Sequence, residues 1–200
     1  TDNGSHAMST KQPDRRPFLK GAATASALAA ADVALGASSD IIDTAGTGPM
    51  PMRTLGRTGE KVPILHFGTS QRLDQTHDKV MHRCLKGGVS WFDTALSYGW
   101  GSSHSATANF LGQSRAQKNM WLTSKSGSGS VGGLEKGLDE ALAELKTDFL
   151  DIYLMHGIDD EDMLEPKFIK AGERFRQSGK TRFFGFSCHD GNVAQLLDKA

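Results

Sequence analysis

The order of strand-like and helix-like stretches is the sequence feature that most restricts the fold. Beyond residue 50, short apolar runs alternate with amphipathic runs that favour helix. This order is typical of a parallel α/β fold, and nearly continuous apolar strands indicate a sheet covered on both faces. The predicted strands cover 62–70, 89–95, 120–127, 149–157 and 181–189, and the predicted helices cover 76–88, 104–112, 134–146, 166–180 and 192–200.

Polar residues recur where the predicted strands end. Asp93, Lys125, His156 and Ser187 end four successive strands at spacings of 32, 31 and 31 residues. Such even spacing favours equal βα units around a (β/α)8 TIM barrel over a doubly wound sheet. In that barrel the carboxyl ends of the strands converge on one mouth, where chemistry occurs. The sequence therefore predicts about five of the eight βα units, with these side chains around one site.

Composition excludes several other classes of function. The chain has 23 basic and 23 acidic side chains, so its net charge offers no attraction to nucleic acid or to an anionic membrane. Cys84 and Cys188 stand far apart and belong to no CxxC or metal-type spacing. We therefore predict neither a metal site nor a disulfide framework.

The first 50 residues are expected to lie outside the barrel. Residues 1–7 are interpreted as an expression-tag remnant, 8–37 as a signal peptide and 38–50 as a linker, which leaves 51–200 for the N-terminal part of the barrel.

The predicted signal peptide rests on an arginine pair followed by an Ala-rich run. Arg15 and Arg16 resemble the start of a twin-arginine export signal, although Asp14 stands where such signals usually carry Ser or Thr. The run is too short and too weakly apolar for a stable membrane span. This predicts a periplasmic protein exported by the twin-arginine machinery; the alternative is a cytoplasmic protein with an Ala-rich N-terminal helix.

The strand-end residues provide the groups that carbonyl reduction needs. A carbonyl that accepts a hydride develops charge on its oxygen, so a proton donor and a polarising donor are required there. Tyr98 follows Asp93 by five residues and offers a phenol; Lys125 offers an ammonium that favours the phenolate, and a carboxylate can hold that ammonium. His156 offers an imidazole that can orient the carbonyl oxygen.

The segments FDTALSYG, LTSKSG and LAELKTDFLDIYLMHG resemble the aldo-keto reductases. The resemblance implies a (β/α)8 barrel that reduces aldehydes and ketones with NADPH or NADH and has no Rossmann domain. It also implies a catalytic tetrad in which Asp93 pairs with Lys125, Lys125 tunes Tyr98, Tyr98 protonates the substrate oxygen, and His156 orients it.

Two further segments extend the resemblance. Residues 55–69, LGRTGEKVPILHFGT, are similar to the family's N-terminal hairpin and first strand, and 179–190, GKTRFFGFSCHD, to its fifth strand. There Ser187 would contact the nicotinamide carboxamide. The implied cofactor is NADP, with NAD as the alternative, and the implied cofactor contacts are Gly68, Thr69, Asp93, Ser187 and Cys188.

The sequence also departs from the family pattern. Cys188 replaces the usual Asn after the fifth-strand Ser, and the helix start SSHSATANFLG lacks the usual acid after Ser. The chain ends in the fifth helix, so it is expected to be part of a longer protein, with open sheet edges and without the later strands that hold most of the family's cofactor.

Two other functions stay open on the residues alone. Lys125 could form a Schiff base with a carbonyl substrate, as in a lyase. The chain could instead be a non-catalytic, reductase-like subunit that binds the cofactor and senses it. The Gly-rich segment 126–133 lacks the phosphate-binding context and is interpreted as a substrate loop or the approach to a helix.

Overall fold

A computed structural model describes residues 49–116 and 119–200. These residues belong to one compact unit that spans Asp43–Ala200. The predicted tag remnant and export signal, and all of the predicted linker except its last two residues, lie outside the described residues. Within the described ranges no helix has both the length and the apolar character needed to cross a membrane.

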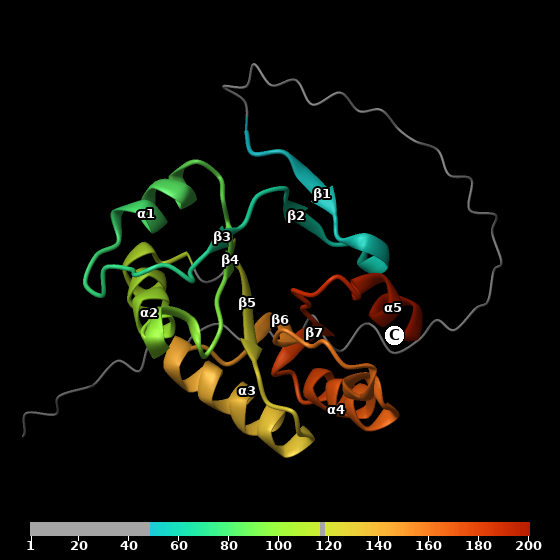
Figure 1. Cartoon of the computed structure of the whole chain (residues 1–200). Helices are drawn as coiled ribbons and strands as arrows, with labels where there is room; N and C mark the ends of the chain where they lie inside the picture. The colour runs from blue at the N-terminus through green and yellow to red at the C-terminus, as the bar shows by residue number, and fades with distance from the viewer. Residues whose placement is uncertain (1–48, 117–118) are drawn as a thin grey trace, which may run out of the picture. The chain divides into compact units, whose positions relative to one another are not determined.

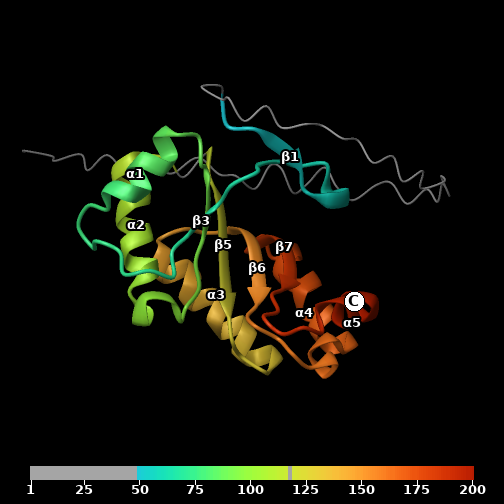
Figure 2. The same ribbon diagram turned by 45° about the horizontal axis from the view of Figure 1, so that its top comes forward.

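Five parallel strands form a single sheet in which each strand pairs with the next along the chain. Figures 1 and 2 show them as a curved row, the arrangement expected for an arc of a (β/α)8 barrel. The predicted fold class is therefore confirmed. The strands are β3 (Phe67–Gly68), β4 (Trp91–Asp93), β5 (Trp121–Ser126), β6 (Leu150–Met155) and β7 (Thr181–Phe186).

Helices follow the strands in alternation and begin at residues suited to helix starts. Asp78 caps α1 by accepting hydrogen bonds from the backbone N–H groups of Val80 and Met81, and Pro166 opens α4. Figure 1 shows α2, α3 and α4 on the outer side of the sheet. The helices are α1 (Lys79–Lys86), α2 (Ser103–Ser114), α3 (Val131–Leu145), α4 (Pro166–Gln177) and α5 (Val193–Lys199), with short helical turns η3 (Tyr98–Gly101) and η5 (Glu161–Leu164).

The first predicted strand and the end of one predicted helix were placed wrongly. The segment 62–70 divides: β2 (Lys61–Pro63) pairs antiparallel with β1 (Met52–Thr54), and only β3 joins the parallel sheet. The turn η2 (Gly56–Thr58) between β1 and β2 makes this hairpin, whose pairing takes up the first part of the run. Helix α2 continues beyond Gly112, because the left-handed Arg115 ends it instead.

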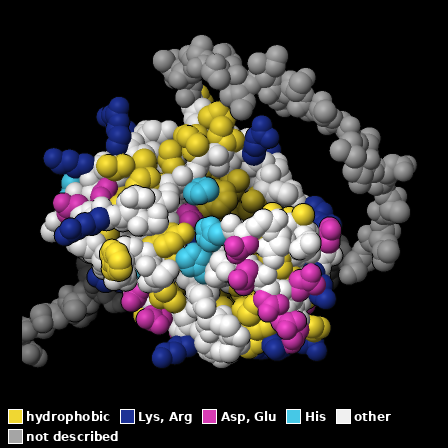
Figure 3. All heavy atoms as spheres, in the orientation of Figure 1, with side chains coloured by type: hydrophobic (Ala, Val, Ile, Leu, Met, Phe, Trp, Pro, Cys, Tyr) yellow, Lys and Arg dark blue, Asp and Glu magenta, His cyan; other side chains and the backbone are white. Residues whose placement is uncertain are grey.

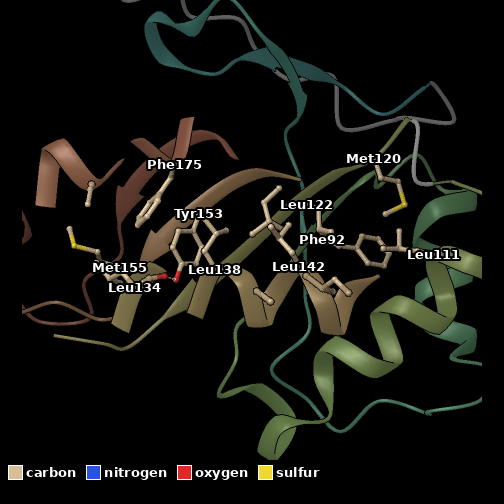
Figure 4. Close-up of a cluster of buried hydrophobic side chains, with 14 of the residues drawn as sticks. Phe92, Leu111, Met120, Leu122, Leu134, Leu138, Leu142, Tyr153, Met155 and Phe175 are labelled. Carbon is tan, nitrogen blue, oxygen red and sulfur yellow. Dashed lines mark hydrogen bonds between the residues drawn. The ribbon is translucent and has the colours of Figure 1, made fainter. Parts of the chain in front are cut away.

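The apolar stripe of α3 covers the outer face of the sheet, as its spacing predicts (Figure 4). Leu134, Leu138 and Leu145 are fully buried there, and Tyr153 reaches from β6 to donate a hydrogen bond to the Leu134 carbonyl at 2.8 Å. Truncation of a leucine in such a position costs about 2–5 kcal/mol. This packing fixes the strands, and with them the residues at their ends.

The other face of the sheet is less covered. In β6 the outward Tyr153 and Met155 are buried, whereas Ile152 and Leu154, on the inner face, are half-buried. Among the described strands β3 and β7 form the edges of the parallel sheet, as expected for an arc. Beside β7, an apolar groove of about 270 Å³ lies between β7, α4 and η5.

Candidate active site

The carboxyl ends of three adjacent strands bring the four predicted catalytic side chains together. Asp93 ends β4, Lys125 is the second-last residue of β5, and His156 follows β6 directly. Tyr98 opens η3, in the segment that leads from β4 to α2. Because parallel strands end at the same edge, side chains separated by about 30 residues become neighbours.

Lys125 is at the centre of this group. Its side chain is 6% exposed, and its Nζ donates hydrogen bonds to Asp93 Oδ2 at 2.6 Å and to the Thr94 carbonyl at 2.9 Å. The same nitrogen lies 3.3 Å from the Tyr98 hydroxyl and 4.5 Å from the centre of its ring. A buried ammonium needs a counter-charge, and Asp93 supplies it. The pairing holds a positive charge against the phenol oxygen.

His156 is packed against the ring of Tyr98. The two ring centres lie 5.4 Å apart with the planes nearly perpendicular, and the His189 ring lies 6.2 Å beyond. Burial lowers the pKa of His156, and the charge of Lys125 and the proximity of His189 lower it further. The imidazole is therefore held neutral near pH 7, so it has one N–H to donate and one nitrogen to accept.

A buried network of hydroxyl groups holds the backbone at Asp93. Thr69 Oγ1 donates to the Asp93 carbonyl at 3.0 Å, and Ser103 Oγ lies 2.6 Å from Thr69 Oγ1 and 2.8 Å from Thr94 Oγ1. Thr69, predicted to contact the cofactor, thus directs its hydroxyl into the protein and is fully buried. Gly68, predicted for the same role, is exposed.

Of the two predicted cofactor residues after β7, Ser187 connects this loop to the loop after β6, whereas Cys188 contacts residues of its own loop. Ser187 Oγ accepts a hydrogen bond from the Gly157 N–H at 2.9 Å, and the Ser187 carbonyl accepts one from the Ile158 N–H at 2.8 Å. Cys188 is a free thiol whose Sγ lies 3.4 Å from Asn192 Oδ1. Both residues are half-buried, and the Ser187 hydroxyl still has its own hydrogen to donate.

Sequence reasoning missed an exposed indole next to the site. Trp100 follows Tyr98 by two residues, is fully exposed, and adopts a left-handed backbone with φ of 59°. A bulky residue in this conformation is unusual and costs about 1–2 kcal/mol. On the face shown in Figure 3, histidine side chains lie side by side close to acidic ones.

Sequence reasoning also missed two pairs of contacts made by histidines away from the catalytic group. His104 is buried in α2, with one ring nitrogen 2.7 Å from Glu144 and the other 2.9 Å from Ser124. On the surface, the rings of His77 and His82 stack at 4.2 Å. The only signal for His104 was its place where the family has an acid; its partner stands 40 residues away. Among the residues described, no three His, Cys, Asp or Glu side chains gather as a metal site would require.

Comparison with known proteins matches residues 65–200 to the model of the aldo/keto reductase family. The uncharacterized oxidoreductase YrpG of Bacillus subtilis is 31% identical over 156 residues, which are 66% of this chain and 48% of that protein. An aldo-keto reductase of Schizosaccharomyces pombe named for NADP(+) is 24% identical over 157 residues, 69% of this chain and 45% of its own length.

A solved structure of an aldo-keto reductase has a similar fold. The holo form of an aldo-keto reductase from Bacillus halodurans superimposes with a TM-score of 0.64 at 27% identity. The match covers 76% of this chain and 55% of that protein. The chain thus spans about half the length of the relatives that it matches.

Proposed function

The chain belongs to the aldo/keto reductase family, and on that premise we propose that it contributes the catalytic group of an NADP-dependent enzyme that reduces an aldehyde or ketone. The observation that carries the proposal is the position of Lys125 Nζ, 2.6 Å from Asp93 and 3.3 Å from the Tyr98 hydroxyl.

Tyr98 is the proton donor in this mechanism. A bound reduced nicotinamide would supply the hydride, and the Tyr98 O–H would donate its proton to the carbonyl oxygen as charge develops there. The ammonium of Lys125, 3.3 Å away, stabilises the phenolate that remains. Asp93 keeps that ammonium in place. Proton exchange with solvent then restores the phenol.

His156 positions the carbonyl. Its neutral imidazole stands beside the Tyr98 ring and can donate one N–H to the same substrate oxygen. A protonated imidazole would carry its own charge next to Lys125, and the low pKa avoids this. With two donors on one oxygen, the carbonyl carbon is presented in a fixed orientation.

Ser187 is the residue that would hold a nicotinamide at the strand ends. The Ser187 hydroxyl accepts a hydrogen bond from the Gly157 N–H and has its own hydrogen to donate, which could bind a carboxamide oxygen at the same edge of the sheet as Lys125. Gly68 adds an exposed backbone at the end of β3, where no side chain would obstruct a flat ring. NADP is favoured over NAD by the name of the Schizosaccharomyces relative.

Schiff-base chemistry on Lys125 is less well supported. A Schiff base forms from a free amine. The Lys125 nitrogen already donates hydrogen bonds to a carboxylate at 2.6 Å and to a carbonyl at 2.9 Å, so it is not a free amine.

The test is Tyr98→Phe in the full chain, with Lys136→Ala on the exposed side of α3 as the control. NADPH binding, followed by its fluorescence, should be kept in Tyr98→Phe while turnover on a panel of aldehydes falls by about 10²–10⁴. The control should behave as the wild type. Equal turnover in Tyr98→Phe and the wild type, or trapping of substrate on Lys125 by borohydride, would reject the proposal.

We propose in addition that the protein is exported to the periplasm, on the strength of Arg15 and Arg16 before the Ala-rich run. Replacement of both arginines by lysine should keep the protein in the cytoplasm in a fractionated bacterial host. Lys11→Arg, which leaves the pair intact, serves as the control. Equal periplasmic recovery of the double variant and the control would contradict export by this route.

A further inference from the structure

His104 is a buried titratable residue that the proposed mechanism does not use. It occupies the second position of α2 and is 1% exposed. Burial lowers the pKa of its imidazole, against the opposing effect of its hydrogen bond to Glu144. A neutral, buried imidazole needs a partner for each nitrogen, and it has both.

The two partners fix the tautomer of His104. Glu144 Oε2 lies 2.7 Å from Nδ1, and a carboxylate can only accept, so Nδ1 carries the hydrogen. Nε2 must then accept the hydroxyl hydrogen of Ser124, 2.9 Å away. Glu144 from α3, His104 from α2 and Ser124 from β5 thus form one directed chain of hydrogen bonds.

These three hydrogen-bonded residues have the composition of a hydrolytic triad but cannot act as one. Ser124 is fully buried on the side of the sheet that faces the helices, so no substrate reaches its oxygen. The next residue in β5 is Lys125, whose side chain points to the opposite face because successive residues in a strand alternate. The hydrogen bonds from Glu144 through His104 to Ser124 therefore hold the backbone from which Lys125 projects.

His104 also lies close to the segment that carries Tyr98. The segment from β4 to α2 passes through Tyr98 and ends at Ser103, which is anchored to Thr69 and Thr94. The bond from His104 to Ser124 joins the end of that segment to β5. It spans the two parts of the chain that must keep the phenol and the ammonium 3.3 Å apart.

We propose that His104 is a positioning residue that sets the distance between Tyr98 and Lys125 by joining α2 to β5 through Ser124. The inference rests on the proposed function only for its kinetic consequence. The charged groups that act on His104 are Glu144 and Glu140 from α3 and Lys125 from β5.

The decisive test uses the fact that the chain has only two tyrosines, Tyr98 and Tyr153. With tyrosine labelled with ¹³C at the ζ carbon alone, the full chain should give two ring-carbon resonances in NMR spectra without any cofactor. Tyr153→Phe assigns them, and is also the matched control, because it removes a different buried bond between a helix and a strand.

In His104→Ala the Tyr98 resonance should shift or split, while the Tyr153 resonance stays in place. His104→Gln, whose amide can still reach Ser124, should restore part of the wild-type position. If His104→Ala does not fold, Ser124→Ala removes the same bond and should give the same shift. A folded His104 or Ser124 variant with an unmoved Tyr98 resonance would overturn the proposal.

The kinetic readout separates this inference from the proposed function. In an active wild type, His104→Ala should lower kcat about tenfold with KM for NADPH nearly unchanged, because a displacement of the two groups by a fraction of an ångström affects the chemical step. Tyr153→Phe should keep kcat. If the wild type is inactive but its Tyr98 resonance still responds to substitution of His104, the proposed function is rejected and the positioning role is kept. If His104→Ala raises KM and leaves kcat unchanged, the positioning role is rejected.

Discussion

Strands β5 and β7 have the same length and direction but very different surroundings. All six residues of β5 are buried, with β4 on one side and β6 on the other. In β7 only Thr181 is buried, and among the described strands β7 pairs with β6 alone. The residue that must be placed most accurately, Lys125, is thus on the strand whose position is most strongly determined. Ser187, which follows β7, has a less constrained support.

The largest expected effect comes from Lys125→Met compared with Ser187→Ala. Loss of the ammonium should lower kcat by about 10²–10⁴, because the phenolate of Tyr98 loses its stabilising charge. Ser187→Ala should instead raise KM for NADPH several-fold, since it removes about one hydrogen bond. Steady-state kinetics measures both. A larger kcat effect at Ser187 than at Lys125 would reverse the comparison between the strands.

A second pair of variants compares β4, which borders β5 in the sheet, with β7 in their contribution to stability. Phe92, which pairs with β5 across the sheet, is fully buried, and Phe92→Ala should lower the free energy of unfolding by about 3–5 kcal/mol. Phe183 in β7 is half-buried, so Phe183→Ala should cost about half as much. Denaturant unfolding tests this, and equal losses would show that β7 is as constrained as β4.

Glycines in two helices sharpen the comparison. A Cβ at Gly172 of α4 would come within 2.2 Å of the Phe184 ring, so Gly172→Ala should destabilise the protein by about 1–3 kcal/mol. Gly132 of α3 is exposed with nothing within 4 Å, and Gly132→Ala should stabilise by about 0.5–1 kcal/mol. Thermal unfolding would measure both. A harmless Gly172→Ala would mean that β7 is loosely held on its helix side too.

The smallest effect is a pH dependence of stability. Burial lowers the pKa of both His104 and His156, so the unfolded chain binds more protons than the folded one. The stabilising contribution is complete above the ordinary histidine pKa of 6.5 and is lost as the pH falls below it towards the lower pKa of the folded state. Unfolding free energies measured from neutral pH to about pH 5 should decline, and His104→Gln should reduce the slope. An unchanged slope would mean that groups other than His104 cause the pH dependence of stability.

Periodicity predicted the βα order and the apolar stripe of α3, because both depend on residues close together in the chain. It also predicted that Asp93, Lys125 and His156 would meet, since equal spacing places them at equivalent strand ends. Tyr98 has no periodic signal because it lies in a loop, and it was predicted from its place five residues after Asp93 and from the chemistry of its phenol, which the family resemblance then supported.

Other features depend on packing between distant segments. Periodicity could not divide 62–70, because pairing of β2 with β1 competes with the sheet for the same apolar run. The contact of His104 with Glu144 depends on how α2 and α3 pack. The role of Thr69, whose hydroxyl turns inward to Ser103, depends on how the start of α2 packs beside the end of β3. These contacts follow from tertiary structure, which a local pattern does not contain.

Trp100 has a practical consequence. The protein has three tryptophans; Trp121 is packed in the sheet, Trp91 is half-buried at its rim, and Trp100 alone among them is fully in water, two residues from the phenol. Its emission should therefore be the most red-shifted and the most easily quenched of the three. A molecule that enters beside Tyr98 would change that signal, so the chain carries its own fluorescent reporter of occupancy.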